Sequence, residues 1–385
     1  MTETVKGFKD YAENDAKKRE KIKEILIRNF KLYCFEPSET PLIEYENFVR
    51  GENSDDETVS DIFKLKDKGN RKLALRYEFT FQLKRLIKNK KLPYKRYQIG
   101  EVFRDEPVSA NRVRQITQCD IDIIGSNAKD EVEILSLTSK ILKELKINFQ
   151  IYVNNRKLLN EILDKEKINE KDKKKIIKEI DKLDKLTEKE VNENLKKYNA
   201  EKILNIFKKP ESYFKKYDSY KEIVELKKYC KIYGVKINFL SSLARGLSYY
   251  NGSVFEIKTR NMKESICGGG SFLVNGIQST GISLGLERLS SLAEIKSDEK
   301  RILIVSIGED EKAIKLGEKL RASGINCEIM FGKISKSLEY ANSKDINYVA
   351  FIGKQEVKKK KIKIRDMKTG KEKLVSEQEL VGKII

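Results

Sequence analysis

The chain has 385 residues, of which 39% are hydrophobic and 36% charged, and its formal net charge is +20. This length suffices for two or three domains with buried cores. Without an apolar run of about 18 residues or an apolar N-terminal signal, the sequence predicts a cytoplasmic protein that has no membrane association. The absence of histidine excludes Ser-His-Asp and Cys-His catalysis and histidine metal sites.

The positive charge has two interpretations that the composition leaves open. It favours a polyanionic partner such as nucleic acid, but a chain rich in Lys, Ile and Asn and free of Trp is also what an A/T-biased genome produces. Only 17 of the 80 basic residues are arginine, which indicates that arginines stand where a planar, bidentate cation is needed. The five widely spaced cysteines predict free thiols, without a zinc ribbon or a disulfide framework.

The first elements in chain order are a helix and a long-looped hairpin. Apolar residues at helical spacing predict an amphipathic helix over 15–33, and a short strand follows at 42–43. Strand-like runs at 94–104 and 113–124, joined by the polar loop 105–112, predict an antiparallel pair.

Alternation in the second strand of this pair separates polar from apolar side chains. One face carries Arg114, Gln118, Asp120 and Asp122, and the other carries apolar residues. This pattern is typical of the floor of a binding pocket, and equally of the solvent-facing side of an antiparallel sheet.

The second half of the chain begins with a lysine-rich segment. Residues 155–238 contain 24 basic and 16 acidic residues, with apolar residues at helical spacing, and predict a helical insertion. A strand at 249–257, a glycine triplet at 268–270 and a strand-to-helix run at 281–289 follow. From residue 299 onward, strands alternate with helices, which predicts a separate α/β domain with a mostly parallel sheet.

Three of these segments resemble the motifs of class II aminoacyl-tRNA synthetases. Residues 96–104 with 112–122 resemble motif 2, 281–289 resemble motif 3, and the helix leading to 39–41 resembles motif 1, the dimerisation element. The segment Arg-Gly-Leu-Ser-Tyr-Tyr at 245–250 is similar to the signature of histidyl-tRNA synthetases.

Two shorter strings refine the resemblance. Leu-Arg-Tyr-Glu-Phe-Thr at 75–80 and Gln-Cys-Asp-Ile-Asp at 118–122 are similar to the archaeal and eukaryotic members of that family. The resemblance implies an α+β fold: an antiparallel-sheet catalytic domain in two parts, 1–154 and 239–296, the helical insertion 155–238, and an anticodon-binding domain at 299–385. It also implies a homodimer that binds ATP with Mg²⁺, L-histidine and tRNA(His).

The resemblance assigns roles in ATP binding to five residues. It implies that Arg104 holds the α-phosphate, that Glu106 binds the adenine amino group, and that Arg288 contacts the γ-phosphate and adenine. Arg112 and Arg114 would contact the outer phosphates or the tRNA end. Joining a carboxylate to a phosphate needs fixed positive charge and no base of pKa near 7, so a histidine-free chain can perform it.

The resemblance also implies a histidine site. Glu78, Thr80 and Gln118 would bind the α-amino group, and Asp122 with Tyr250 the imidazole ring. Arg245 would bridge the histidine carboxylate and the α-phosphate, which makes it, with Arg104, the expected catalytic residue. Tyr249 and Gly269 complete the set of expected histidine-binding residues, and no metal ligands are expected in the protein.

The sequence departs from the family pattern at four positions near this site. Ser248 stands where the family usually has Asp, and Ser271, Phe272 and Leu273 stand where it has Arg, Tyr and Asp. Two alternatives therefore accompany the prediction of a histidine–tRNA ligase. One is a non-catalytic, synthetase-like regulatory subunit of histidine biosynthesis, although the retained arginines and the additional C-terminal domain disfavour it. The other is a general nucleic-acid-binding protein, which does not explain where the arginines lie.

Overall fold

The computed structural model describes residues 3–50, 61–109, 112–184, 186–246, 249–295 and 300–384. It divides into two compact units, Met1–Ile295 and Lys296–Ile385, and each contains its own apolar cores. No helix in the described part of the chain is both long and apolar enough to cross a membrane.

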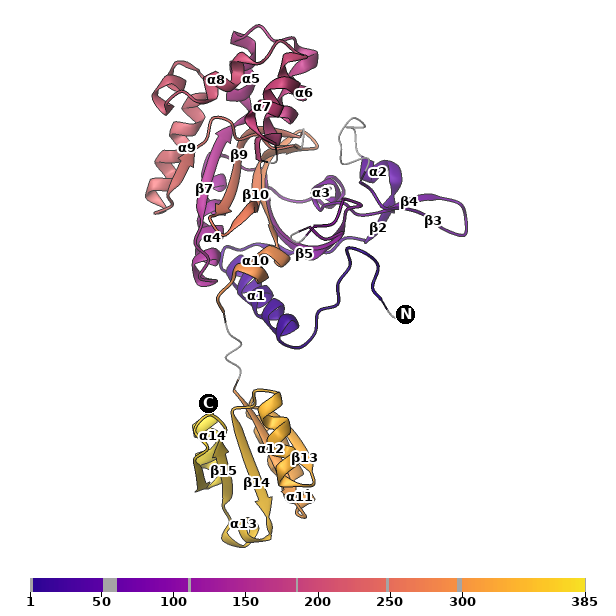
Figure 1. The fold of residues 1–385 in the computed structure, drawn as a ribbon, viewed down its shortest axis with the longest axis vertical. Coiled ribbons are helices and arrows are strands. Elements are labelled where there is room, and N and C mark those ends of the chain that lie inside the picture. The colour runs from indigo at the N-terminus through magenta and orange to yellow at the C-terminus, as the bar shows by residue number, and fades with distance from the viewer. Residues whose placement is uncertain are drawn as a thin grey trace. The chain divides into compact units, whose positions relative to one another are not determined.

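The first unit is built on an eight-stranded sheet (Figure 1). Its strands are β1 (Glu36–Pro37), β5 (Tyr94–Phe103), β6 (Gln115–Ile124), β7 (Gln150–Asn155), β8 (Ile237–Phe239), β9 (Tyr250–Thr259), β10 (Met262–Val274) and β11 (Ile277–Gly285). Their order across the sheet is β1-β5-β6-β11-β10-β9-β7-β8, and only the outer pairs β1–β5 and β7–β8 are parallel. The antiparallel-sheet fold predicted from the sequence is confirmed.

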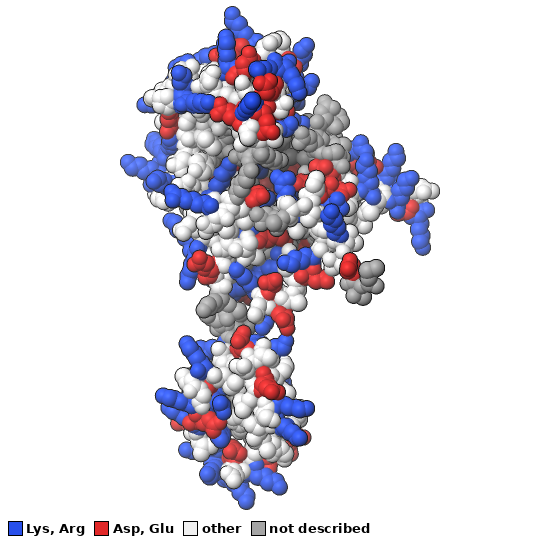
Figure 2. Space-filling view, in the orientation of Figure 1, with Lys and Arg blue, Asp and Glu red and all other residues white. Residues whose placement is uncertain are grey.

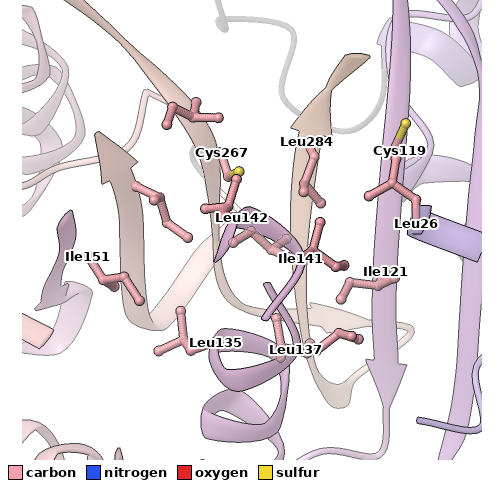
Figure 3. Packing of buried hydrophobic residues seen from close by; sticks show 14 of the residues in the cluster. Leu26, Cys119, Ile121, Leu135, Leu137, Ile141, Leu142, Ile151, Cys267 and Leu284 are labelled. Carbon is pink, nitrogen blue, oxygen red and sulfur yellow. The ribbon is translucent and has the colours of Figure 1, made fainter. Parts of the chain in front are cut away.

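Helices cover one face of this sheet and leave the other face for the site. They are α1 (Glu13–Leu32), α4 (Ala128–Glu144) and α10 (Leu286–Leu292). The side chain of Asn127 caps α4 in a capping box with Asp130, which explains where this helix begins. In Figure 3 Leu137 of α4 and Leu26 of α1 lie beside two residues of β6, Ile121 and Cys119 respectively, and all four belong to one apolar cluster. Because these two residues of β6 face the core, Gln118, Asp120 and Asp122 face the opposite side.

A smaller sheet and a short helix lead the chain into the site. The strands β2 (Ile43–Tyr45), β3 (Lys64–Lys66) and β4 (Lys72–Leu75) form an antiparallel sheet in the order β2-β4-β3, and α2 is Glu46–Arg50. The residues after β4 pass over the face of the large sheet that α1, α4 and α10 leave open, and α3 (Thr80–Leu86) packs there in an apolar cluster that includes residues of β6, β9 and β10.

The helical insertion lies between β7 and β8. Its helices are α5 (Arg156–Lys165), α6 (Glu170–Asp181), α7 (Glu188–Lys196), α8 (Lys202–Phe207) and α9 (Tyr220–Ile232), with 3-10 turns at Lys182–Asp184 and Glu211–Lys216. Most of their apolar residues are buried in two clusters of their own, and the lysines lie mainly on the outer faces. We call α5–α9 and their connections the insertion.

The second unit is an α/β domain with a mixed sheet in the order β13-β12-β14-β15-β16. Its elements are β12 (Arg301–Ile307), α11 (Asp310–Ala322), β13 (Asn326–Phe331), α12 (Ile334–Ser343), β14 (Tyr348–Gly353), α13 (Lys354–Lys359), β15 (Ile362–Asp366), β16 (Glu372–Val375) and α14 (Glu377–Ile384). The pairs β12–β13 and β12–β14 are parallel, whereas β14–β15 and β15–β16 are antiparallel, so the separate α/β domain is as predicted but its sheet is mixed and not mostly parallel. The short helices α13 and α14 were not predicted.

Candidate active site

A row of buried polar side chains crosses the open face of the large sheet. On β6, Asp120 and Asp122 are 4% exposed and Gln118 7%. The register places Gln98 of β5 opposite Asp120 and Arg96 opposite Asp122, and both partners are also buried. The alternative of a solvent-facing strand is therefore wrong. Burying three such groups side by side is costly unless they are paired or bind a ligand, so this row has the character of a pocket floor.

Asp122 shares its carboxylate with a buried cation. The guanidinium Nη2 of Arg96, which is fully buried, lies 2.7 Å from Asp122 Oδ2. The pKa of Asp122 is raised to about 7. Burial is the main cause of this rise, Arg96 opposes it, and Asp120 adds to it. The second oxygen, Oδ1, lies 2.0 Å from the point that a Cβ at Gly281 would occupy, so only glycine leaves room for this carboxylate.

Glu78 is a second buried carboxylate beside this row. Burial raises its pKa to about 8, with Asp120 adding to the rise and Arg104 opposing it. The hydroxyl of Tyr249 donates to Glu78 Oε2 at 3.4 Å, and the Tyr249 side chain also forms a hydrogen bond with Thr80 at the start of α3. Glu78, Thr80 and Tyr249, all predicted to bind histidine, thus form one connected group.

Three aromatic rings form a wall of the same site. Tyr250 lies 4.7 Å from Tyr249 between ring centroids, and Phe272 lies 5.5 Å from Tyr249 and 6.5 Å from Tyr250. A Cβ at Gly270 would meet the Tyr250 ring at 2.8 Å, so the missing side chain at Gly270 lets this ring pack against the backbone of β10. Phe272 occupies this wall without the hydroxyl that the family's tyrosine would supply there.

Arg245 lies over β10 between two carboxylate-bearing elements. Its Nη1 donates to Glu256 Oε1 of β9 at 2.6 Å, and Lys258 Nζ lies 3.1 Å from the other oxygen of Glu256. A Cβ at Gly268 would lie 2.5 Å from Arg245 Nη1, so the guanidinium rests directly on the glycine backbone. Burial lowers the pKa of Arg245, but Tyr250 and Glu256 outweigh burial and raise it overall, which keeps the group charged.

Three further arginines gather at the other end of the site. Arg104 stacks over Tyr77 at 4.6 Å from the ring centroid, and its Nη2 donates to Gln118 Oε1 at 3.3 Å. Arg288 Nη1 donates to the carbonyl oxygen of Ser265 at 2.6 Å. Burial lowers the pKa of Arg288, Glu264 opposes this, and the positive charges of Arg104 and Arg112 lower it further. These arginines therefore lie close enough to repel one another, an arrangement suited to a polyanion.

Arg114 differs from these three because its guanidinium is used within the loop after β5. Its Nη2 lies 3.0 Å from Asp105 Oδ1, and its Nε donates to the carbonyl oxygen of Glu106 at 3.1 Å. Its side chain also packs on Gly7, where a Cβ would lie 2.7 Å from Arg114 Cγ. Arg114 thus braces the loop that carries Glu106, and its contact with the outer phosphates or the tRNA end stays a prediction.

Two expected site positions face the core side of the sheet. A Cβ at Gly269 would meet Phe255 of the apolar core at 2.9 Å, so Gly269 could contact a ligand only through its backbone. Ser271, which stands where the family has Arg, is 2% exposed and donates a hydrogen bond to Glu131 of α4. The departure at Ser248 lies outside the described residues.

Three residues of the site had no role assigned from the sequence. These residues are Arg96, Asp120 and Glu256, and all three are buried. Arg96 forms an ion pair with Asp122, Glu256 forms one with Arg245, and Asp120 lies on β6 between Gln118 and Asp122. Alternation along β6 indicates Asp120, whereas the pairing of Arg96 with Asp122 and of Glu256 with Gly268 depends on strand register. In the described residues no group of three metal-ligating side chains could hold a metal ion.

Comparison with known proteins places this geometry in a family. Residues 7–289 match the family model described as histidyl-tRNA synthetase, and 301–385 match that of an anticodon-binding domain. The histidine–tRNA ligase 1 of Bacillus cereus is 31% identical, over 96% of both chains. The histidine–tRNA ligase of Wolinella succinogenes is 33% identical, over 96% of this chain and 95% of its own.

A solved structure agrees in fold with both units. The histidyl-tRNA synthetase of Nostoc has a TM-score of 0.87 and 24% identity, and the match covers 100% of this chain and 99% of the Nostoc chain. The match of 7–289 to one family model and the identities above 30% over nearly the whole length show the family. The chain therefore belongs to the histidyl-tRNA synthetase family, one of the aminoacyl-tRNA synthetases.

Proposed function

We propose that this chain is a histidine–tRNA ligase that joins L-histidine to ATP, releases pyrophosphate, and transfers the histidyl group to the 3′ end of tRNA(His). The observation that carries the proposal is a site with two differently equipped ends, in which Arg245 lies on Gly268 of β10 beside Tyr250. One end holds Glu78 and Asp122, which suit cationic and N–H groups, and the other holds Arg104 and Arg288, which suit phosphates.

At the amino-acid end, the α-ammonium group of histidine would bind Glu78, Thr80 and Gln118. The imidazole would contact Asp122 and Tyr250, while Tyr249 holds Glu78 in place. Discrimination built on such hydrogen bonds is large, about 10⁴-fold, because a non-matching side chain leaves buried polar groups unpaired.

At the nucleotide end, Arg104 would contact the α-phosphate, and Arg112 and Arg288 the outer phosphates. A carboxylate oxygen of histidine attacks the α-phosphorus, the bond to the bridging oxygen breaks, and pyrophosphate leaves with that electron pair. Arg245 and Arg104 stabilise the added negative charge, so no proton has to move in this step.

Glu106 is proposed to bind the adenine amino group, held in place through its backbone by Arg114. Mg²⁺ would enter with ATP and neutralise its phosphates when bound. Since no cluster of metal ligands exists among the described residues, the phosphates themselves would supply most of its ligands.

The tRNA contacts proposed here involve both additional parts of the chain. The C-terminal unit would bind the anticodon, as its family model implies, and the insertion would contact the acceptor side. Figure 2 shows Lys and Arg side chains over the outer surface of the insertion, with acidic side chains between them. We also propose that the protein is a homodimer and that it is located in the cytoplasm. The likeness of residues 75–80 and 118–122 to archaeal and eukaryotic members of the family is part of the same proposal.

The test is amino-acid-dependent exchange of pyrophosphate into ATP, run with each amino acid in turn. Histidine alone should support exchange, and the protein should then charge tRNA(His). A regulatory subunit would bind histidine without exchange, and a general nucleic-acid-binding protein would bind tRNA without either activity. Arg245→Lys should lower exchange by about 10²-fold, as expected for a lost transition-state donor, while the exposed control Arg260→Lys should not.

A further inference from the structure

The segment that carries Arg245 is enclosed by the insertion on one side. Ala244, the residue directly before it, is 3% exposed. It lies in the same apolar cluster as Ile176, Ile177 and Ile180 of α6. The catalytic arginine is thus attached to a residue of the insertion's own core.

The residue after Arg245 also meets α6. Asp181, the last residue of that helix, has its Oδ2 2.9 Å from the position of a Cβ at Gly246. Its negative charge acts on Arg245 together with that of Glu256. The guanidinium therefore lies in the field of two carboxylates, one from the catalytic sheet and one from the insertion.

Hydrogen bonds fix the residues just upstream in the same way. Ser241 Oγ donates to the carbonyl oxygen of Phe207 in α8 at 2.7 Å. Asn154 Nδ2 of β7 donates to the carbonyl oxygens of Ser241 and Leu243, both at 2.9 Å. From Ser241 to Gly246 the chain is held by α6 and α8 as well as by the sheet.

We propose that the insertion positions Arg245 for histidyl-adenylate formation, with Asp181 as the positioning residue, so that this step depends on the insertion even when no tRNA is present. The proposal rests on the catalytic role proposed for Arg245. The carboxylates of Asp181 and Glu256 both attract the guanidinium of Arg245, and their combined attraction sets where it lies over Gly268. A displacement of about 1 Å at such a group can cost 10²-fold in rate, so a small shift of α6 would be felt at the reacting phosphate.

The direct test is single-turnover adenylate formation without tRNA. Asp181→Asn should lower the rate at saturating histidine and ATP by about 5- to 30-fold, the size of coupling between neighbouring groups. The KM values and the melting temperature should change little. Asp181→Glu should recover part of the rate because it restores the charge. The control Asp172→Asn, at the other end of α6, should match the wild type.

A double-mutant cycle separates positioning from a general structural effect. Once Arg245→Lys has removed the guanidinium, adding Asp181→Asn should lower the rate by less than twofold. Equal effects in both backgrounds, or a wild-type rate for Asp181→Asn, would overturn the inference, as would Asp181→Glu with no more activity than Asp181→Asn. Absence of histidine-dependent exchange in the wild-type protein would instead refute the proposed function.

Discussion

The carboxylate of Asp122 illustrates how one residue serves both the fold and the site. It pairs with Arg96, which is completely buried, and we propose that it also binds the imidazole of histidine. An Asp at the end of a buried ion pair can accept one more hydrogen bond without adding another buried charge. The ion pair would thus hold an acceptor ready for the ligand.

Replacing the Asp122 carboxylate tests its role in stability and its proposed role in histidine binding. Asp122→Asn should raise the KM for histidine by about 10- to 100-fold, since a charge-assisted hydrogen bond contributes roughly 1.5–3 kcal/mol. The KM for ATP should stay unchanged. Arg96 would lose its partner, so the free energy of unfolding should fall by about 3–5 kcal/mol. The double variant Arg96→Gln/Asp122→Asn should recover stability and not histidine affinity. An unchanged KM for histidine in Asp122→Asn would make the pair purely structural.

The raised pKa of Glu78 has a consequence for binding. At pH 7 a carboxyl group with a pKa of about 8 is mostly protonated in the unliganded protein, but contact with the α-ammonium group of histidine requires the carboxylate. Histidine binding at pH 7 should therefore release a proton. Calorimetric titrations in buffers of different ionisation enthalpy measure this release. Glu78→Gln should reduce this proton release. The control Glu101→Gln should not, because Glu101 lies on the face of β5 opposite to Arg96 and Gln98.

The same group also makes stability depend on pH. The folded-state pKa of Glu78 lies above its ordinary value of 4.5, so its protonated form favours the folded state. Its contribution is fully present below pH 4.5 and is lost as the pH rises through about 8. The unfolding free energy of the unliganded protein should fall across this range, and less steeply in Glu78→Gln. An equal slope in both proteins would contradict the assignment.

At the level of elements, β10 serves as a glycine platform for Arg245. Gly268→Ala would place a methyl group where Nη1 now lies, so adenylate formation should fall at least about 10-fold through misplacement. Gly285→Ala on β11 is the matched control, because its Cβ would lie 3.9 Å from Arg288 Cδ, in ordinary contact. Single-turnover rates of the two variants give the answer, and equal rates would show that Arg245 does not depend on the platform.

The elements and the site differ in how much the sequence predicted. Helix α1 and strands β5 and β6 follow from periodicity, because each buries one apolar face, and β12 follows from a continuous apolar run that is buried on both faces. Arg104, Arg245 and Arg288 follow from motif resemblance. The Arg96–Asp122 pair and the contact of Asp181 with Gly246 could not be predicted, since they depend on strand register and on the docking of α6. The short helices α13 and α14 have too few residues for a periodic signal.

At the scale of the whole molecule, the two units should divide the reaction between them. Deleting residues 299–385 should leave histidine-dependent pyrophosphate exchange intact, because every proposed contact with histidine and ATP lies in the first unit. Aminoacylation of tRNA should be lost. In the intact protein, charging should weaken steeply with added salt, as phosphate contacts are screened. If the shortened protein charges tRNA as well as the intact one, the second unit has another role.

The order of strands in the large sheet has a consequence for how the protein is made. Strand β11 lies between β6 and β10, and its Gly281 pairs with Asp122 from a much earlier part of the chain. During synthesis one edge of β6 therefore stays unpaired until the ribosome has released the insertion and all strands from β7 to β11. Such distant pairing slows folding and exposes the edge to association with other chains. The centre of the active site is thus the last part of the catalytic sheet to close.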